Sequence, residues 1–197
     1  MKPLLIVAGV FVAGVLAIGL WFMGTYNNLV ALRENVNQSW GQVQNVYQRR
    51  SDLVPNLVET VKGAANFEKG TLQAVVEARA KVGSMTVDKS VLNDPSKFKQ
   101  FQENQGQLSS ALNHLMVVVE KYPDLKATSN FRDLQVQLEG TENRITVERR
   151  SFNEAAQGYN TAIKVIPGSI VAGLGHFQER PYFEAAPEAQ KAPTVKF

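Results

Sequence analysis

An uncharged apolar stretch near the N-terminus limits what this chain can fold into more than any other feature. From Leu4 to Gly24 the sequence reads LLIVAGVFVAGVLAIGLWFMG. About 20 such residues span the hydrocarbon core of a bilayer as one helix. A cleavable signal peptide would have a shorter apolar region and a longer basic start, and a lipoprotein anchor would need a cysteine, which the chain lacks. We therefore expect residues 1–25 to be an uncleaved, single-pass transmembrane anchor with the lipid bilayer as its partner.

The charges on the two sides of this stretch differ by about one, which bears on topology. Lys2 and the chain terminus precede the stretch, and Arg33 is the cation that follows it most closely. The positive-inside rule then favours a cytoplasmic N-terminus and a body on the extracytoplasmic side.

Small residues recur within the stretch at Gly9, Ala13 and Ala17. This spacing of four places them on one helix face, where small side chains let two helices approach closely in lipid. The stripe predicts self-association through the anchor. The alternative is that the stripe has no role in association, because Gly and Ala are common in membrane helices.

The chain after the anchor has apolar residues at alternating steps of three and four, the spacing of a helical seam. The first seam comprises Leu29, Leu32, Val36, Trp40, Val43, Tyr47, Arg50, Val54, Leu57, Val61 and Ala64. Its phase does not slip at Pro55, so we expect one kinked helix that continues to about Val82. The alternative is a tight turn at 50–52, with Ser51 or Asp52 capping a new helix that has Pro55 in its first turn.

Two more helices are expected, over about 95–121 and 127–166, after a loop at 83–95 that is rich in turn residues. No segment of the body between the anchor and the tail reads as part of a sheet. The predicted fold is all-α: the transmembrane helix continues into an antiparallel bundle of three long helices, or four if the first breaks. The predicted division is an anchor at 1–25, a bundle at 26–167 and an extended C-terminal tail at 168–197.

Polar residues interrupt the seams and predict a polar layer inside the bundle. They are Arg50, Gln105, Glu142 and Arg149. A buried charge is costly unless it is paired. We therefore expect Arg50 or Arg149 to be partly buried and bonded to Glu142, Gln105 or a backbone carbonyl, within one chain or across two. Such a layer would fix helix register. The functional alternative is an ion or ligand site. A ferritin-type di-metal centre needs Glu-x-x-His pairs, and neither His114 nor His176 has a Glu three residues before it.

The composition argues against several classes of function. Lys and Arg exceed Asp and Glu by only 21 − 18 = 3, and no basic stripe carries interleaved aromatics, so a nucleic-acid partner is not expected. The absence of cysteine excludes disulfides and thiol nucleophiles. No nucleophile–base pair or phosphate loop occurs. We predict no enzymatic activity, no catalytic residues, no metal and no cofactor.

Several motifs together resemble the LemA family of bacterial membrane-anchored helical proteins. They are YNNLV (26–30), RRSDLVPNLVETVKG (49–63), VVEARA (75–80), ENRITVERRSFNEAAQGYN (142–160) and PYFEA (181–185). The resemblance covers nearly the whole chain. It implies an N-terminal transmembrane helix in the bacterial cytoplasmic (inner) membrane, a bundle of three or four long helices, and no established enzymatic activity. Family genes often lie near those of a membrane metallopeptidase and of exported proteins. One departure is Phe152, where the family pattern has Tyr.

Two functions remain open at this point. The first is a non-catalytic membrane scaffold that self-associates into a homo-oligomer. The alternative is an adaptor that recruits a membrane or exported partner, for example a protease, through its C-terminal tail. The last residues, APTVKF, have the alternation of an extended strand that could add to a sheet edge with its free carboxylate held in a backbone nest. Otherwise the tail packs along the bundle through its apolar side chains: Phe177, Tyr182, Phe183, Val195 and Phe197.

Overall fold

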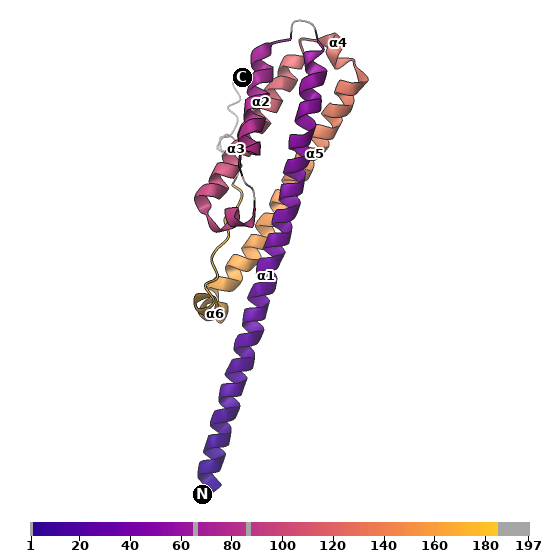
Figure 1. The fold of residues 1–197 in the computed structure, drawn as a ribbon. Coiled ribbons are helices and arrows are strands. Elements are labelled where there is room, and N and C mark those ends of the chain that lie inside the picture. Colours follow the sequence, from indigo (N-terminus) through magenta and orange to yellow (C-terminus); the bar gives the residue numbers. More distant parts are fainter. Residues whose placement is uncertain (1, 65–66, 86–87, 185–197) are drawn as a thin grey trace, which may run out of the picture. The chain divides into compact units, whose positions relative to one another are not determined.

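The computed structural model describes residues 2–64, 67–85 and 88–184, and this part of the chain contains helices and irregular segments but no strand (Figure 1). The elements are α1 (Lys2–Lys62), α2 (Lys69–Gly83), the 3₁₀ helix η1 (Lys89–Asn93), α3 (Pro95–Val119), α4 (Pro123–Lys126), α5 (Ser129–Lys164) and α6 (Gly168–Leu174). The prediction of an all-α fold is confirmed.

Helix α1 passes through Pro55 without interruption, so the prediction of one continuous helix at this point is confirmed. The seam residues on both sides of the proline are buried, among them Trp40, Val54 and Leu57 at 0% exposure. The apolar face therefore keeps its phase through the position where a main-chain donor is missing.

The predicted continuation of this helix to Val82 is wrong, because α1 ends at Lys62 and α2 is a separate helix. The chain turns at Gly63, a weak helix former, and the N–H of Ala64 donates to the carbonyl of Val61 over 3.0 Å. The buried residues of α2 again follow steps of four and three: Thr71, Val75 and Ala78.

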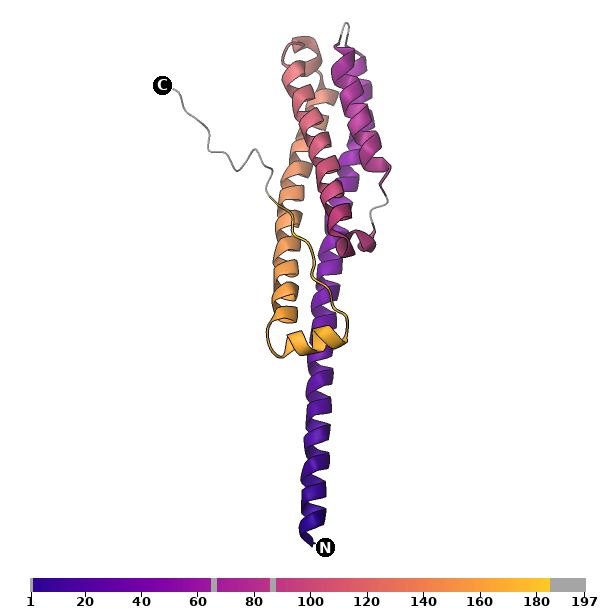
Figure 2. The same cartoon turned by 90° about the vertical axis from the view of Figure 1, so that its left-hand side faces the viewer.

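The chain divides into two compact units. Unit 1 takes in Met1–Gln38 and Glu154–Arg180, and unit 2 takes in Ser39–Asn153 and the chain from Pro181 onward. In unit 2, the second part of α1, then α2, α3 and the first part of α5 lie side by side with alternating direction (Figure 2). Unit 2 is thus a four-helix bundle, which is the second of the two helix counts predicted.

The apolar core of unit 2 draws on all four of these helices. It contains Val54, Leu57, Val58 and Val61 from α1, Val75 and Ala78 from α2, Leu108, Leu112, Leu115, Val118 and Val119 from α3, and Phe131 and Leu138 from α5, with Phe67 from the link between α1 and α2 and Leu125 from the short helix α4. Asp94 caps α3 by accepting hydrogen bonds from the N–H groups of Ser96 and Lys97. This is the cap that the Asn-Asp-Pro sequence favours.

Unit 1 contains the N-terminal part of α1, the end of α5 and α6. The predicted extended tail is wrong over residues 168–174, which form α6. Gly168 is required where α5 gives way to α6, because a Cβ at this position would lie 1.9 Å from the carbonyl oxygen of Ala162. Residues 177–184, which we call the strap, follow α6 without regular secondary structure.

Candidate functional site

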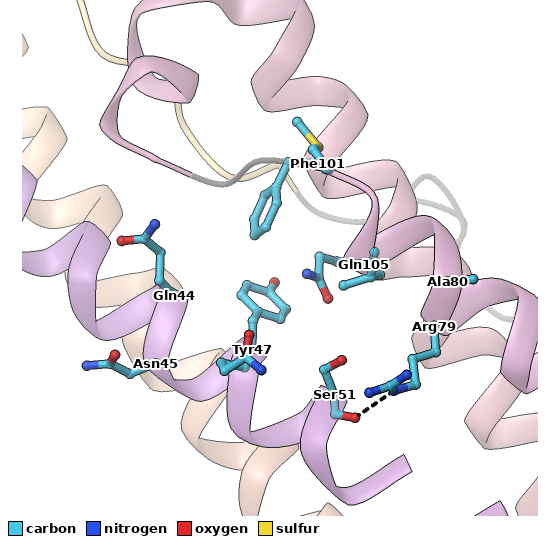
Figure 3. Close-up of a pocket in the computed structure, with 12 residues that line it drawn as sticks. Gln44, Asn45, Tyr47, Ser51, Arg79, Ala80, Phe101 and Gln105 are labelled. Atoms are coloured by element: carbon cyan, nitrogen blue, oxygen red, sulfur yellow. Dashed lines mark hydrogen bonds between the residues drawn. The ribbon is translucent and has the colours of Figure 1, made fainter. Parts of the chain in front are cut away.

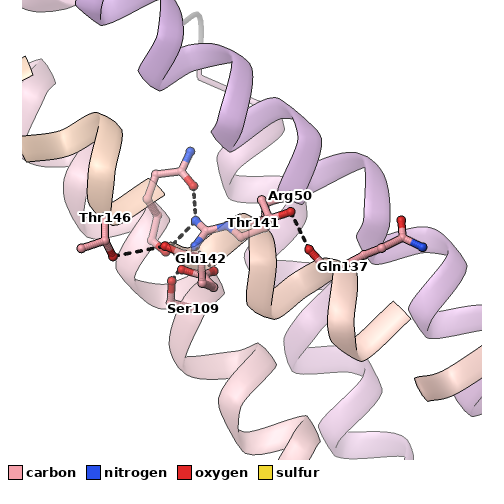
Figure 4. Close-up of polar contacts among 7 residues, drawn as sticks. Arg50, Ser109, Gln137, Thr141, Glu142 and Thr146 are labelled. Carbon is pink, nitrogen blue, oxygen red and sulfur yellow. Dashed lines mark hydrogen bonds and ion pairs between the residues drawn. The ribbon is translucent and has the colours of Figure 1, made fainter. Parts of the chain in front are cut away.

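A buried arginine lies at the centre of the polar layer in unit 2 (Figure 4). The side chain of Arg50, on α1, is 1% exposed. Its Nη1 donates to Ser109 Oγ over 2.6 Å and to Glu142 Oε1 over 2.7 Å. Its Nη2 donates to the carbonyl of Gln105 over 3.2 Å and also to the side-chain oxygen of that residue. One guanidinium therefore joins α1, α3 and α5.

The structure brings together three of the four residues predicted for the polar layer: Arg50, Gln105 and Glu142. The charge of Arg149 acts on Tyr47 together with the charges of Arg50 and Glu142, but its side chain also bonds to the strap. Its Nη2 donates to the carbonyl of Glu184 over 2.8 Å, and its guanidinium carbon lies 4.8 Å from the ring centre of Phe183. Arg149 is thus partly buried and bonded to a backbone carbonyl, and that carbonyl belongs to the strap and not to one of the long helices.

A pocket of about 800 Å³ opens beside this layer between α1, α2 and α3 (Figure 3). Its polar lining includes Tyr47, Ser51, Arg79 and Gln105, and none of its lining residues is acidic. Such a lining suits a neutral or anionic polar group rather than a cation.

Arg79 also serves the carbonyl that Pro55 leaves without a donor. In an uninterrupted helix the N–H of residue 55 would bond to the carbonyl of residue 51. Here the Nε of Arg79, on α2, donates to the carbonyl of Ser51 over 3.1 Å (Figure 3). A neighbouring helix thus replaces the hydrogen bond that proline removes.

An aromatic cage in unit 2 encloses the ring of Phe183, a strap residue that is 6% exposed. We define the cage by four residues: Trp40, Phe98, Phe101 and Phe152. The ring centres of Phe98 and Phe152 lie 4.9 and 5.5 Å from that of Phe183. Trp40 and Phe101 lie at 6.3 and 6.4 Å.

Phe152, the departure from the family pattern, is completely buried in this cage. Its ring centre lies 5.6 Å from that of Trp40. Its ring also packs on those of Phe98 and Phe183, so the phenylalanine fills this position by ring packing.

Side-chain amides bind the backbone of the strap beside the cage. Asn153 Nδ2 donates to the carbonyl of Phe183 over 3.0 Å, and the N–H of Phe183 donates to Asn153 Oδ1 over 2.9 Å. Gln102 Nε2 donates to the carbonyl of Glu184 over 2.9 Å, and the N–H of Glu184 donates back to Gln102 Oε1 over 3.4 Å. Each amide satisfies both backbone groups of one strap residue.

The same arrangement recurs in unit 1 at the start of the strap. Asn160 Nδ2 donates to the carbonyl of Arg180, and the N–H of Arg180 donates to Asn160 Oδ1, both over 2.8 Å. The hydroxyl of Tyr159 donates to the carbonyl of Gln178 over 2.9 Å. Burial raises the pKa of Tyr159 above its ordinary value of 10.0, although the Arg180 and Arg33 guanidinium groups oppose the shift.

The predicted tail contacts divide into four groups. Phe183 fills the cage. Phe177 packs in unit 1, where its ring centre lies 5.4 Å from that of Tyr26 and 5.1 Å from the guanidinium carbon of Arg33. Tyr182 is 42% exposed. Val195 and Phe197 lie outside the described residues.

The strap-binding amides were not predicted, although the sequence carries a signal for them. Asn153 and Asn160 are seven residues apart, which places them two turns apart on one helix face. Paired amides at this spacing can bind an extended segment that runs along the helix. Gln102 and Arg79 offer no such local pattern.

The predicted anchor corresponds to the first part of α1. Among the residues the structure describes, α1 is the one helix long and apolar enough to cross a membrane, and none of its most apolar window is buried. Gly9, Ala13 and Ala17 are all exposed there. A Cβ at Gly9 would meet no atom within 4 Å.

The residues that the structure describes do not form a metal-binding site. No group of three or more His, Cys, Asp or Glu side chains among them could hold a metal ion. The polar contacts described above hold parts of the chain together. They are the buried arginine layer, the hydrogen bond from Arg79 to the Ser51 carbonyl and the amide contacts to the strap.

Comparisons with known proteins place these features in a family. The family model described as the LemA family matches residues 39–197. Magnetosome protein MamQ 2 of Paramagnetospirillum magneticum is 26% identical over 181 residues, which cover 82% of this chain and 65% of that protein. The chain thus spans just under two thirds of the length of this relative.

Two further relatives are similar to this chain to a comparable degree. Magnetosome protein MamQ of Magnetospirillum gryphiswaldense is 24% identical over 204 residues, with 94% of this chain and 74% of that protein covered. Protein LemA of Metamycoplasma hominis is 26% identical over 161 residues, with 80% and 69% covered. With the apolar α1, these similarities indicate a membrane-associated helical protein. Because the family model matches most of its length, the chain belongs to the LemA family.

Proposed function

We propose that this protein is a non-catalytic scaffold, anchored in the bacterial cytoplasmic membrane by a single pass, that self-associates into a homo-oligomer. The observation that carries the proposal is the composition of α1. Within one unbroken helix it contains a candidate membrane span and, further along, buried core residues of a helical bundle. A helix of this kind suits a protein whose role is to hold a folded body at a membrane.

Self-association is proposed to use the small-residue face of the anchor. Gly9, Ala13 and Ala17 share one face, and close packing at such faces is a main source of helix association in lipid. The proposed partners are therefore the lipid bilayer and further copies of the chain, and not nucleic acid.

Cross-linking in native membranes tests this association. Wild-type protein should give a ladder of species above the monomer, and Ala13→Leu should weaken it, because a larger side chain separates the helices. Ala8→Leu is the matched control, since residue 8 lies about 140° away round the helix. An unchanged ladder in Ala13→Leu, or an equal loss in both variants, would refute the proposed interface.

The body is proposed to lie on the extracytoplasmic side, in keeping with the charges that flank the anchor. The chain has no cysteine, so a single introduced cysteine reports its own side of the membrane. Lys126→Cys, at the exposed C-terminal end of α4, should react with a membrane-impermeant maleimide in intact cells. Labelling only after lysis would place the body in the cytoplasm.

The adaptor role remains a second candidate, favoured by the binding of the strap. Gln102 and Arg149 both bond to Glu184, so the last described residue is held at a defined place on unit 2. Deleting residues 194–197 should abolish capture of a partner without changing thermal stability if the tail is a ligand. A loss of stability or a changed oligomer would instead indicate packing of the tail.

A further inference from the structure

We propose that the site in unit 2 that holds strap residues 181–184 is a peptide-binding site, and that it also accepts the same segment from a second copy of this chain. We call it the strap site and define it by the aromatic cage together with Gln102, Arg149 and Asn153. This inference adds a second self-association contact to the proposed function and does not depend on the anchor.

The strap site recognises backbone, as sites for extended peptides do. Asn153 and Gln102 each donate to one strap carbonyl and accept from the N–H of the same residue. A side-chain amide can mimic a backbone peptide group in this way because it carries both a donor and an acceptor. These four hydrogen bonds would form with any extended segment in the same register.

The cage adds a requirement for one aromatic side chain. Phe183 is 6% exposed among the cage rings, and the guanidinium of Arg149 lies 4.8 Å from its ring centre. Buried aromatic anchors of this kind carry most of the affinity of an interface. Tyr182, next to it, is 42% exposed and contributes little selectivity. The ligand class is therefore an extended segment with one buried phenylalanine.

A second copy supplies this ligand with no change in chemistry. Its residues 181–184 would make the same contacts in another chain's strap site, as in domain swapping. The boundary between the two contact units falls between Arg180 and Pro181, so the cage-bound residues and the preceding strap residues belong to different units. Whether the segment binds its own chain or a neighbour is then decided by effective concentration.

A peptide-binding experiment tests whether the site accepts a segment in trans. The probes are labelled peptides with the sequence of residues 178–184, QERPYFE, and the matched control QERPYAE. Full-length Phe183→Ala protein in detergent should bind the first about 30-fold more tightly than the second. Wild-type protein should bind it more weakly than the variant, because its own strap competes.

The contradicting results of this experiment are specific. Equal binding of the two peptides, or no binding by a variant that still melts cooperatively, would overturn the proposal. If Phe183→Ala does not fold, Phe183→Leu keeps an apolar side chain in the cage and serves in the same comparison with the same criteria.

A mixed-pair experiment tests exchange between copies. One tagged copy carries Phe183→Ala, which leaves its own cage unfilled. The other carries Asn153→Ala, which keeps an intact segment but weakens its own site. Both also carry Ala13→Leu, so the anchor contact is weakened equally. The mixed pair should co-purify several-fold better than either variant with itself, which would indicate exchange.

Equal recovery of mixed and like pairs would overturn exchange between copies. Because every copy carries the same anchor substitution, this outcome is independent of the ladder experiment on Ala13→Leu alone. The two self-association contacts can therefore fail separately.

Discussion

Arg50 and Glu142 are separated by 92 positions in the sequence, and their side chains meet at 2.7 Å. The pair is asymmetric: the arginine side chain is 1% exposed and the glutamate side chain is 42% exposed. A buried guanidinium without a counter-charge is strongly unfavourable. The carboxylate keeps part of its hydration, so it neutralises the arginine at a smaller desolvation cost.

Replacing Glu142 with alanine should lower the free energy of unfolding by about 1–3 kcal/mol, less than the cost of breaking a fully buried pair because Glu142 is partly solvated. Chemical denaturation followed by circular dichroism measures the loss. Glu139→Ala is the control on the same helix, since Glu139 is exposed and accepts a hydrogen bond from Gln135, one turn away on the surface of α5. Equal effects of the two variants would mean that the arginine layer adds no stability.

Because Arg79 replaces the hydrogen bond that Pro55 removes from the Ser51 carbonyl, substitutions at residues 79 and 55 should have coupled effects on stability. Arg79→Met should destabilise the protein by about 1 kcal/mol, the usual net value of one hydrogen bond. In a Pro55→Ala background the cost should be smaller, because the N–H of the new alanine can bond to that carbonyl. A double-mutant cycle measured by urea denaturation should give about 0.5–1 kcal/mol of interaction energy. Strictly additive effects of the two substitutions would contradict this role of Arg79.

The close approach at Gly168 predicts opposite effects for two similar substitutions in α6. Gly168→Ala should destabilise the protein by about 1–3 kcal/mol, because its Cβ would overlap the backbone oxygen of Ala162. Gly173→Ala meets no atom within 4 Å and should stabilise by a few tenths to about 1 kcal/mol through helix propensity. Thermal melting distinguishes them, and melting temperatures that move in the same direction would refute the predicted contact.

The raised pKa of Tyr159 leads to a prediction about how stability responds to alkaline pH. Because burial raises its folded-state pKa above 10.0, the unfolded state loses the phenol proton first as pH rises. The stabilising contribution is therefore complete below pH 10 and is lost as pH rises through the folded-state pKa. Tyr159→Phe should cost about 1 kcal/mol at pH 8, where the bond to Gln178 is lost, and should flatten the decline above pH 10. Identical slopes for both proteins would contradict this assignment.

Local spacing was sufficient to predict most of the fold. The three-four alternation of the first seam identified residues that are buried in α1, and it maintained its phase at Pro55. The same alternation could not reveal the break after Lys62, because two helices that pack on one core share one period. Thr71, Val75 and Ala78 extend that pattern on the far side of the turn.

The polar contacts were harder to predict because their partners are distant in sequence. Arg50, Gln105 and Glu142 lie on seams, so their meeting follows from helix packing. Arg149 has the same seam position but bonds to Glu184, 35 residues away in a segment without periodicity. The amide contacts of Asn153 likewise depend on where the strap passes, which spacing along α5 does not specify.

The mass of the detergent-extracted particle tests the central claim, self-association, most directly. The chain has a mass of 21.8 kDa. Light scattering coupled to size-exclusion chromatography, with the detergent contribution subtracted, should give a protein mass that is a multiple of this value. Ala13→Leu should shift the distribution toward the monomer, and Ala8→Leu should not. A wild-type particle that is strictly monomeric at modest detergent concentration would contradict the scaffold account.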